Sequence, residues 1–128
     1  MQLTKNFKLN EFRCKCGKCN MSNEVFSNVK DAANNLQVLR DALKTPIHIN
    51  SAVRCKHHNK MVNGSLKSQH LLGKAVDIVT KKFSVNQIYD VVIKLREQNK
   101  VKFNGIGIYN TFLHLDLRDN KTEWDYKN

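Results

Sequence analysis

Apolar residues recur along the chain with helical spacing in two places, and each place predicts a helix. The first runs from residue 23 to residue 43, where Pro46 follows shortly after its end. The second begins after Ser84, because Ser84-Val85-Asn86-Gln87 has the form of a capping box. The apolar positions are Val25, Phe26, Val29, Ala32, Ala33, Leu36, Leu39 and Leu43 in the first helix, and Ile88, Val91, Val92 and Leu95 in the second.

Strand-like patterns occupy four shorter segments between and after these helices. The segments are residues 47–53, 75–79, 106–109 and 112–117. The last two are predicted to pair around Asn110-Thr111, whereas the polar stretch 56–69 carries the turn signal Asn63-Gly64. The order helix, strand, strand, helix, strand, strand predicts an α+β fold with two main helices and a small, largely antiparallel sheet.

The length of the chain fits one domain, which we place at residues 1–128, with an irregular cysteine-containing segment at residues 1–21. No stretch approaches the roughly 18–20 consecutive apolar residues of a membrane span. Residues 1–7 include a lysine but no apolar run follows, so we expect no signal peptide. We therefore expect synthesis in the cytoplasm, where the protein stays unless something else releases it.

The chain is strongly basic, with 22 Lys and Arg against 11 Asp and Glu and a net charge of +11. Such an excess favours polyanionic partners, either nucleic acid or an anionic bacterial envelope. The lysines are scattered, and no signature of a DNA- or RNA-binding module is present. Binding to nucleic acid is therefore the less favoured of the two interpretations.

Four cysteines, Cys14, Cys16, Cys19 and Cys55, leave three interpretations open. Four thiolates suit a closed structural zinc site, although C-x-C-x-x-C is not the usual pair of C-x-x-C motifs. Disulfides are the second interpretation, and synthesis in the cytoplasm argues against them. Free thiols are the third.

The segment 68–77 places a histidine and a carboxylate seven residues apart, at His70 and Asp77. Asp77 lies inside an apolar run, where a carboxylate is costly unless it is paired or bound to a cation. Gly73 stands between them and can support a sharp change of backbone direction. Read alone, His70 could be a surface histidine and Asp77 a partner in a salt bridge.

The segment 112–118 alternates strictly between leucines and other residues. Phe112, His114, Asp116 and Arg118 share one face of the predicted strand, and the leucines at 113, 115 and 117 share the other, which belongs to the core. Read alone, the first face could be a solvent-facing surface with an Asp–Arg pair. Two histidines and a carboxylate, however, form a standard catalytic zinc set with a fourth position for water.

These segments together resemble the zinc D-alanyl-D-alanine carboxypeptidase family, a peptidase group that includes phage endolysins. The resemblance rests on S-x-H-x-x-G-x-A-x-D at 68–77, on H-x-D-x-R at 114–118, and on Ser51-Ala52-Val53-Arg54-Cys55 followed by His58-Asn59. It covers nearly the whole chain in the family's order, and it implies a hedgehog-type or D-Ala-D-Ala peptidase-like zinc domain.

The resemblance implies that His70, Asp77 and His114 bind one Zn²⁺, and that Arg54 holds the substrate or its polarised carbonyl, with Ser68 beside the site. The reaction would be hydrolysis of a peptide bond in a peptidoglycan stem peptide, by a D,D-carboxypeptidase or an endolysin-type endopeptidase. Arg54 could equally support the fold through a salt bridge.

The resemblance leaves the general base open. Related enzymes carry an acidic residue or a histidine two or three residues before the third ligand, where this chain has Phe112 and Thr111. Asp116 is the nearest replacement as a base, or else it orients a ligating histidine.

The resemblance also suggests how such an enzyme reaches its substrate: a phage-type lysin, expected to act as a monomer, would reach the cell wall after release by a separate pore. Two alternatives remain: an inactive wall- or partner-binding module with the same zinc fold, and a basic nucleic-acid-binding protein.

Overall fold

The helices begin at the residues that the sequence predicts. The computed structural model describes residues 1–126, so residues 127 and 128 of the predicted domain lie outside the described part. Helix α1 spans Asn23–Leu43, and the Ser22 side chain caps it by accepting a hydrogen bond from the Val25 N–H. Helix α3 spans Val85–Glu97 and begins with the predicted capping box at Ser84.

Three further helical segments are short, and the sequence did not predict them. Helix α2 spans Lys56–Met61, inside the stretch predicted to be polar loop. Two 3-10 helices, η1 at Leu9–Phe12 and η2 at Gln69–Leu72, precede α1 and β2 respectively. These segments are too short to show a helical apolar period, because each completes at most two turns.

Five strands form one sheet in the order β1-β2-β4-β3-β5. They span His48–Ser51, Ala75–Val79, Gly105–Ile108, Leu113–Asp116 and Thr122–Asp125. Every pair is antiparallel except β3 with β5, so the predicted largely antiparallel sheet is confirmed. Strand β5 was not predicted, since its mostly exposed residues give no apolar alternation.

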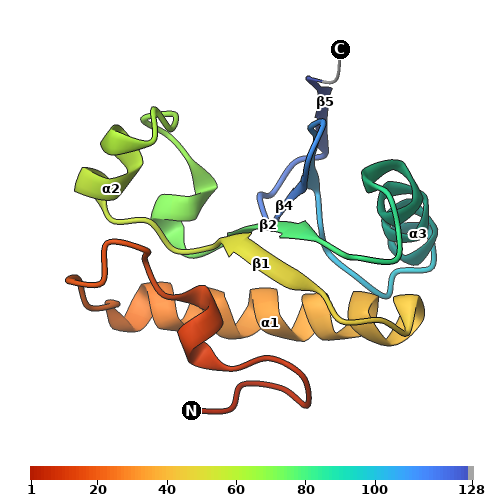
Figure 1. Ribbon diagram of the computed structural model, residues 1–128, viewed down its shortest axis with the longest axis horizontal. Coiled ribbons are helices and arrows are strands. Elements are labelled where there is room, and N and C mark those ends of the chain that lie inside the picture. The colour runs from red at the N-terminus through yellow and green to blue at the C-terminus, as the bar shows by residue number, and fades with distance from the viewer. Residues whose placement is uncertain (127–128) are drawn as a thin grey trace.

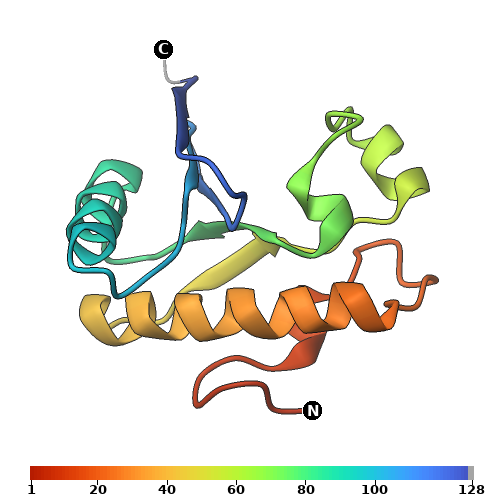
Figure 2. The same cartoon turned by 180° about the vertical axis from the view of Figure 1, so that it is seen from behind.

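One face of the sheet packs into the hydrophobic core, and the other carries the buried polar residues Asp77, His114 and Asp116. Val76 and Ile78 of β2 and Leu113 and Leu115 of β4 are fully buried in one core with the apolar face of α1. Helix α1 runs along one side of the molecule, whereas α2 and the end of β5 lie away from it (Figures 1 and 2). Within residues 1–126, no helix combines the length and apolar character needed to cross a membrane.

Candidate metal centre

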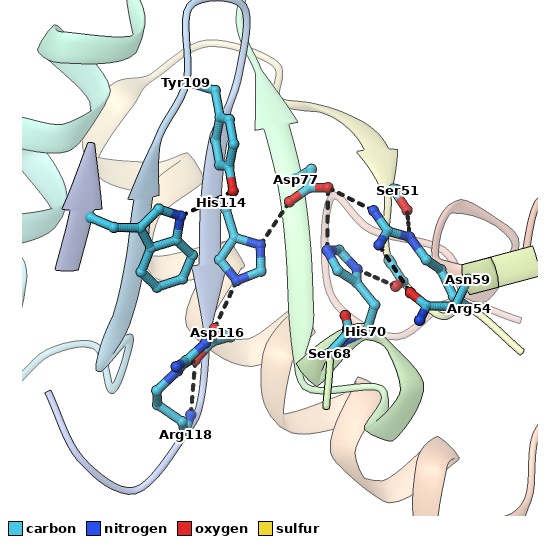
Figure 3. A network of polar contacts seen from close by, with 12 residues as sticks. Ser51, Arg54, Asn59, Ser68, His70, Asp77, Tyr109, His114, Asp116 and Arg118 are labelled. Carbon is cyan, nitrogen blue, oxygen red and sulfur yellow. Dashed lines mark hydrogen bonds and ion pairs between the residues drawn. The ribbon is translucent and has the colours of Figure 1, made fainter. Parts of the chain in front are cut away.

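The three predicted ligands converge on the face of the sheet opposite the leucines. Asp77 on β2 is the direct cross-strand partner of His114 on β4, and His70 reaches them from η2. Each residue offers one ligand atom, and these atoms all lie within 4.8 Å of one another. Figure 3 shows Asp77 between the two imidazole rings. The structure therefore brings together a histidine, a carboxylate and a second histidine, all three buried.

Gly73 makes the approach of His70 possible. It ends η2 with a φ of +76°, which a glycine adopts at little cost, and its Cα faces α1 so closely that a Cβ would lie 2.8 Å from Val25. The predicted change of backbone direction is confirmed at this residue.

The His70 ring is held with one nitrogen free to bind a cation. Its Nδ1 lies 2.6 Å from the backbone carbonyl of Ala52. Because a carbonyl can only accept a hydrogen bond, Nδ1–H is the donor and the free lone pair of the ring lies on Nε2. Nε2 is 3.2 Å from Oδ2 of Asp77, yet within residues 1–126 this buried atom has no hydrogen-bond partner. A buried nitrogen near a carboxylate, but not hydrogen-bonded to it, fits two ligands aimed at one metal ion.

Asp77 supplies the negative charge of the cluster. Its Oδ1 lies 2.9 Å from Nδ1 of His114, and its Oδ2 accepts a hydrogen bond of 3.3 Å from Nη2 of Arg54. Burial pushes the pKa of Asp77 upward, but the contacts with His114 and His70 outweigh it and lower the pKa to about 2. The carboxylate is therefore ionised at neutral pH, as a metal ligand must be.

Each nitrogen of the His114 ring contacts a carboxylate. Its Nε2 lies 2.7 Å from Oδ2 of Asp116, on the side of the ring opposite Asp77. Burial acts to lower the pKa of His114, but hydrogen bonding to Asp116 and then to Asp77 raises it above its ordinary value. Asp116 therefore holds the proton on Nε2, which leaves Nδ1 as the atom that faces the cluster.

Asp116 lies behind the His114 ring and is 0% exposed. Its carboxylate accepts hydrogen bonds from Arg118 Nε at 2.8 Å, Nη2 at 2.7 Å and the backbone N–H at 3.1 Å. Burial raises the pKa of Asp116, but hydrogen bonds from Arg118 and His114 hold it well below its usual range. Of the two roles that the sequence left open, this geometry favours orientation of His114, because a base must reach the attacking water.

Arg54 and Ser68 lie beside the cluster, at the positions that the family resemblance implied. Arg54 donates to Ser51 Oγ at 3.2 Å and to Asn59 Oδ1 at 3.3 Å, besides its contact with Asp77. The Ser68 hydroxyl accepts a hydrogen bond from the His70 N–H and caps η2. Arg54 therefore supports the loop through Ser51 and Asn59 and also lies next to Asp77, one of the predicted ligands.

A groove of about 590 Å³ runs over the cluster. One wall is formed by Arg54 and residues of the segment 62–70, and the other by aromatic side chains and Arg118. These aromatic residues are Tyr109, Phe112, Trp124 and Tyr126. Asp77 is the one carboxylate that lines the groove within the part of the chain described.

The aromatic wall is the part of the site that sequence reasoning missed. The rings of Tyr109 and Phe112 stack with centroids 4.4 Å apart, and Trp124 Nε1 donates to the Tyr109 hydroxyl at 3.0 Å. Arg118 lies over the Trp124 ring at 5.1 Å. The available signal was the pair of aromatic residues on either side of Asn110-Thr111, but only the pairing of β5 with β3 brings Trp124 to them.

Comparisons with known proteins identify a family and a similar fold. The family Peptidase M15 matches residues 5–116. The crystal structure of the L-Ala D-Glu endopeptidase ChiX of Serratia marcescens has a similar fold, with a TM-score of 0.50 and 16% sequence identity. That similarity covers 81% of this chain and 93% of the other. None of the curated proteins compared with the chain matches it.

Proposed function

Because the chain belongs to the peptidase M15 family, we propose that it is a zinc peptidase that hydrolyses peptide bonds in the stem peptides of bacterial peptidoglycan. One observation carries the proposal: three buried donor atoms lie within 4.8 Å of one another, and one of them, His70 Nε2, has no hydrogen-bond partner among residues 1–126. Such an arrangement is expected of a metal-binding peptidase and costs free energy in a protein that binds no cation.

The donor set suits zinc. Two imidazole nitrogens and one carboxylate oxygen form a common catalytic zinc set that leaves a fourth position open. When bound, zinc would polarise the scissile carbonyl and activate water for attack. Magnesium and calcium prefer sites made of oxygen ligands, so this set favours zinc over either of them.

The protein's own side chains prepare this centre. Asp116 fixes the tautomer of His114, and the Ala52 carbonyl does the same for His70. Arg54, with a side chain 15% exposed at the groove, is placed to hold a substrate carbonyl or carboxylate, and Ser68 is placed to contact the peptide. We assign Asp116 to positioning rather than to the role of base.

The family, a similar structure and the net charge of the chain support the choice of substrate. The family consists of peptidases, and the similar structure is that of an L-Ala D-Glu endopeptidase, so the L-Ala–D-Glu bond of the stem peptide is the first bond to test. A D,D-carboxypeptidase activity is the second activity to test. The net charge of +11 favours adhesion to an anionic cell wall, where the protein would act after release in the manner of a phage lysin.

Digestion of purified peptidoglycan tests the proposal. We expect new amino groups, muropeptide masses that identify the bond, loss of activity with a chelator and recovery with zinc. His114→Ala should abolish cleavage, whereas His48→Ala, which changes an exposed histidine outside the groove, should not. Cleavage that persists in His114→Ala would contradict the assigned centre. A folded, zinc-loaded protein that leaves every wall preparation intact would instead indicate the binding module.

A further inference from the structure

The four cysteines come together at a second place in the fold. Cys14, Cys16 and Cys19 belong to the N-terminal segment, and Cys55 precedes α2. Their sulfur atoms all lie within 4.8 Å of one another, and all four thiols are free. The sulfur–sulfur separations are 3.5 Å for Cys16–Cys19, 3.8 Å for Cys14–Cys55 and 3.9 Å for Cys55–Cys16.

These separations match a tetrahedron of thiolates around one zinc ion. A Zn–S bond of about 2.3 Å gives a tetrahedral edge of about 3.8 Å, whereas bonded sulfurs in a disulfide lie about 2.04 Å apart. Four ligands leave no open position for water, which is the mark of a structural site. We propose that Cys14, Cys16, Cys19 and Cys55 bind a second, structural zinc ion, separate from the candidate catalytic centre.

Backbone N–H groups already point at the sulfur atoms, as thiolate ligands require. Cys16 Sγ accepts from the Lys18 N–H at 3.4 Å, Cys14 Sγ from the Cys55 N–H at 3.4 Å, and Cys55 Sγ from the His58 N–H at 3.3 Å. These contacts partly offset the negative charge on sulfur, much as hydrogen bonds tune the ligands of other metal sites.

The surrounding charges are also of the right sign. Zinc with four thiolates carries a net charge of −2, and the chain places exposed cations between and beside the ligands. These are Arg13, Lys15, Lys18 and Lys56. Nearby positive charge favours the thiolate form of cysteine and stabilises an anionic centre.

The proposed ion would join the N-terminal segment to the loop that carries Arg54. The Val53 N–H donates to the Phe12 carbonyl at 3.0 Å, and the Arg54 N–H donates to the His70 carbonyl at 3.0 Å. The same loop supplies the Ala52 carbonyl that orients His70. Loss of the ion should therefore loosen one wall of the groove, even though no cysteine lines it in the described part of the chain.

The test separates this site from the catalytic centre. The His70→Ala/His114→Ala double variant, prepared with reductant and zinc, should retain about one zinc ion per chain, and the wild type about two. X-ray absorption at the zinc edge of the double variant should show only sulfur neighbours at about 2.3 Å. These readouts do not depend on peptidase activity. The structural zinc site can therefore be disproved while the proposed function stands, and the proposed function can be disproved while the structural zinc site stands.

Two cysteine variants make the result sharper. Cys55→Ser keeps an oxygen to cap α2 but should lose the second zinc, which distinguishes ligation from capping. Cys19→His should keep it, because three cysteines and a histidine also form a structural zinc site. The proposal is overturned if the double variant retains no zinc while its four thiols react freely, or if mass spectrometry finds disulfides in protein purified with reductant and zinc.

Discussion

Replacing Asp116 with asparagine keeps the shape of the side chain but exchanges one oxygen for an amide group. Arg118 donates to both carboxylate oxygens and can accept no hydrogen bond, so the remaining oxygen of asparagine should turn toward its Nε and backbone N–H. The amide NH₂ then faces Nε2 of His114, which must become an acceptor. The ring proton moves to Nδ1, the atom that faces Asp77 and the candidate metal position.

The size of the effect follows from this change of tautomer. Loss of an orienting partner of a ligating histidine typically lowers metal affinity about 10–100-fold, which corresponds to about 1.4–2.8 kcal/mol. Asp116→Asn should reach at least that range, because it reverses the 2.7 Å hydrogen bond to His114 Nε2 and so places the ring proton on Nδ1, the predicted ligand atom. Peptidase activity at limiting zinc should fall in parallel.

The assay is the zinc affinity of the purified chain, measured by competition with a chelator of known affinity, with circular dichroism as the check on folding. Asp119→Asn is the matched control, since it removes the same charge three residues away from an exposed side chain. The reasoning is refuted if folded Asp116→Asn binds zinc as tightly as the Asp119→Asn control. A loss of activity with unchanged zinc affinity would instead support Asp116 as the general base.

Two further predictions concern β3 and β5, the paired strands that bring Trp124 to the other aromatic residues of the groove. In Gly107→Ala the new Cβ would lie 2.5 Å from the Trp124 ring, so we expect about 1–3 kcal/mol of destabilisation in urea unfolding and weaker cleavage; wild-type stability would contradict the tight contact. Glu123 accepts from Tyr89 at 2.6 Å and from Arg96 at 2.7 Å, and these contacts lower its pKa. A lowered pKa means that the stabilisation is present above the unfolded pKa of about 4.3 and is lost as the pH falls through the folded value. The stability difference between wild type and Glu123→Gln should therefore shrink in acid, and a difference independent of pH would argue against the ion pair.

The sequence determined those parts of the fold that depend on local pattern. Helix α1 begins after the capping residue Ser22 and ends at Leu43, shortly before Pro46, and its apolar period specifies the buried face. Strand alternation likewise placed His114 and Asp116 on one face, opposite the leucines. The resemblance then proposed His70, Asp77 and His114 as one set, and the register of β2 with β4 brings them together.

Tertiary structure alone decided which distant groups meet. Trp124 joins the groove only because β5 pairs in parallel with β3. The local alternation placed Asp116 on the same strand face as His114, but it did not show that Asp116 is fully buried rather than open to the groove. Cys55 meets the N-terminal cysteines across a sequence separation of about forty residues. Local periodicity reports which side of an element is apolar, but it carries no information on which element will cover that side. Those contacts depend on strand register and loop closure, which only the folded chain defines.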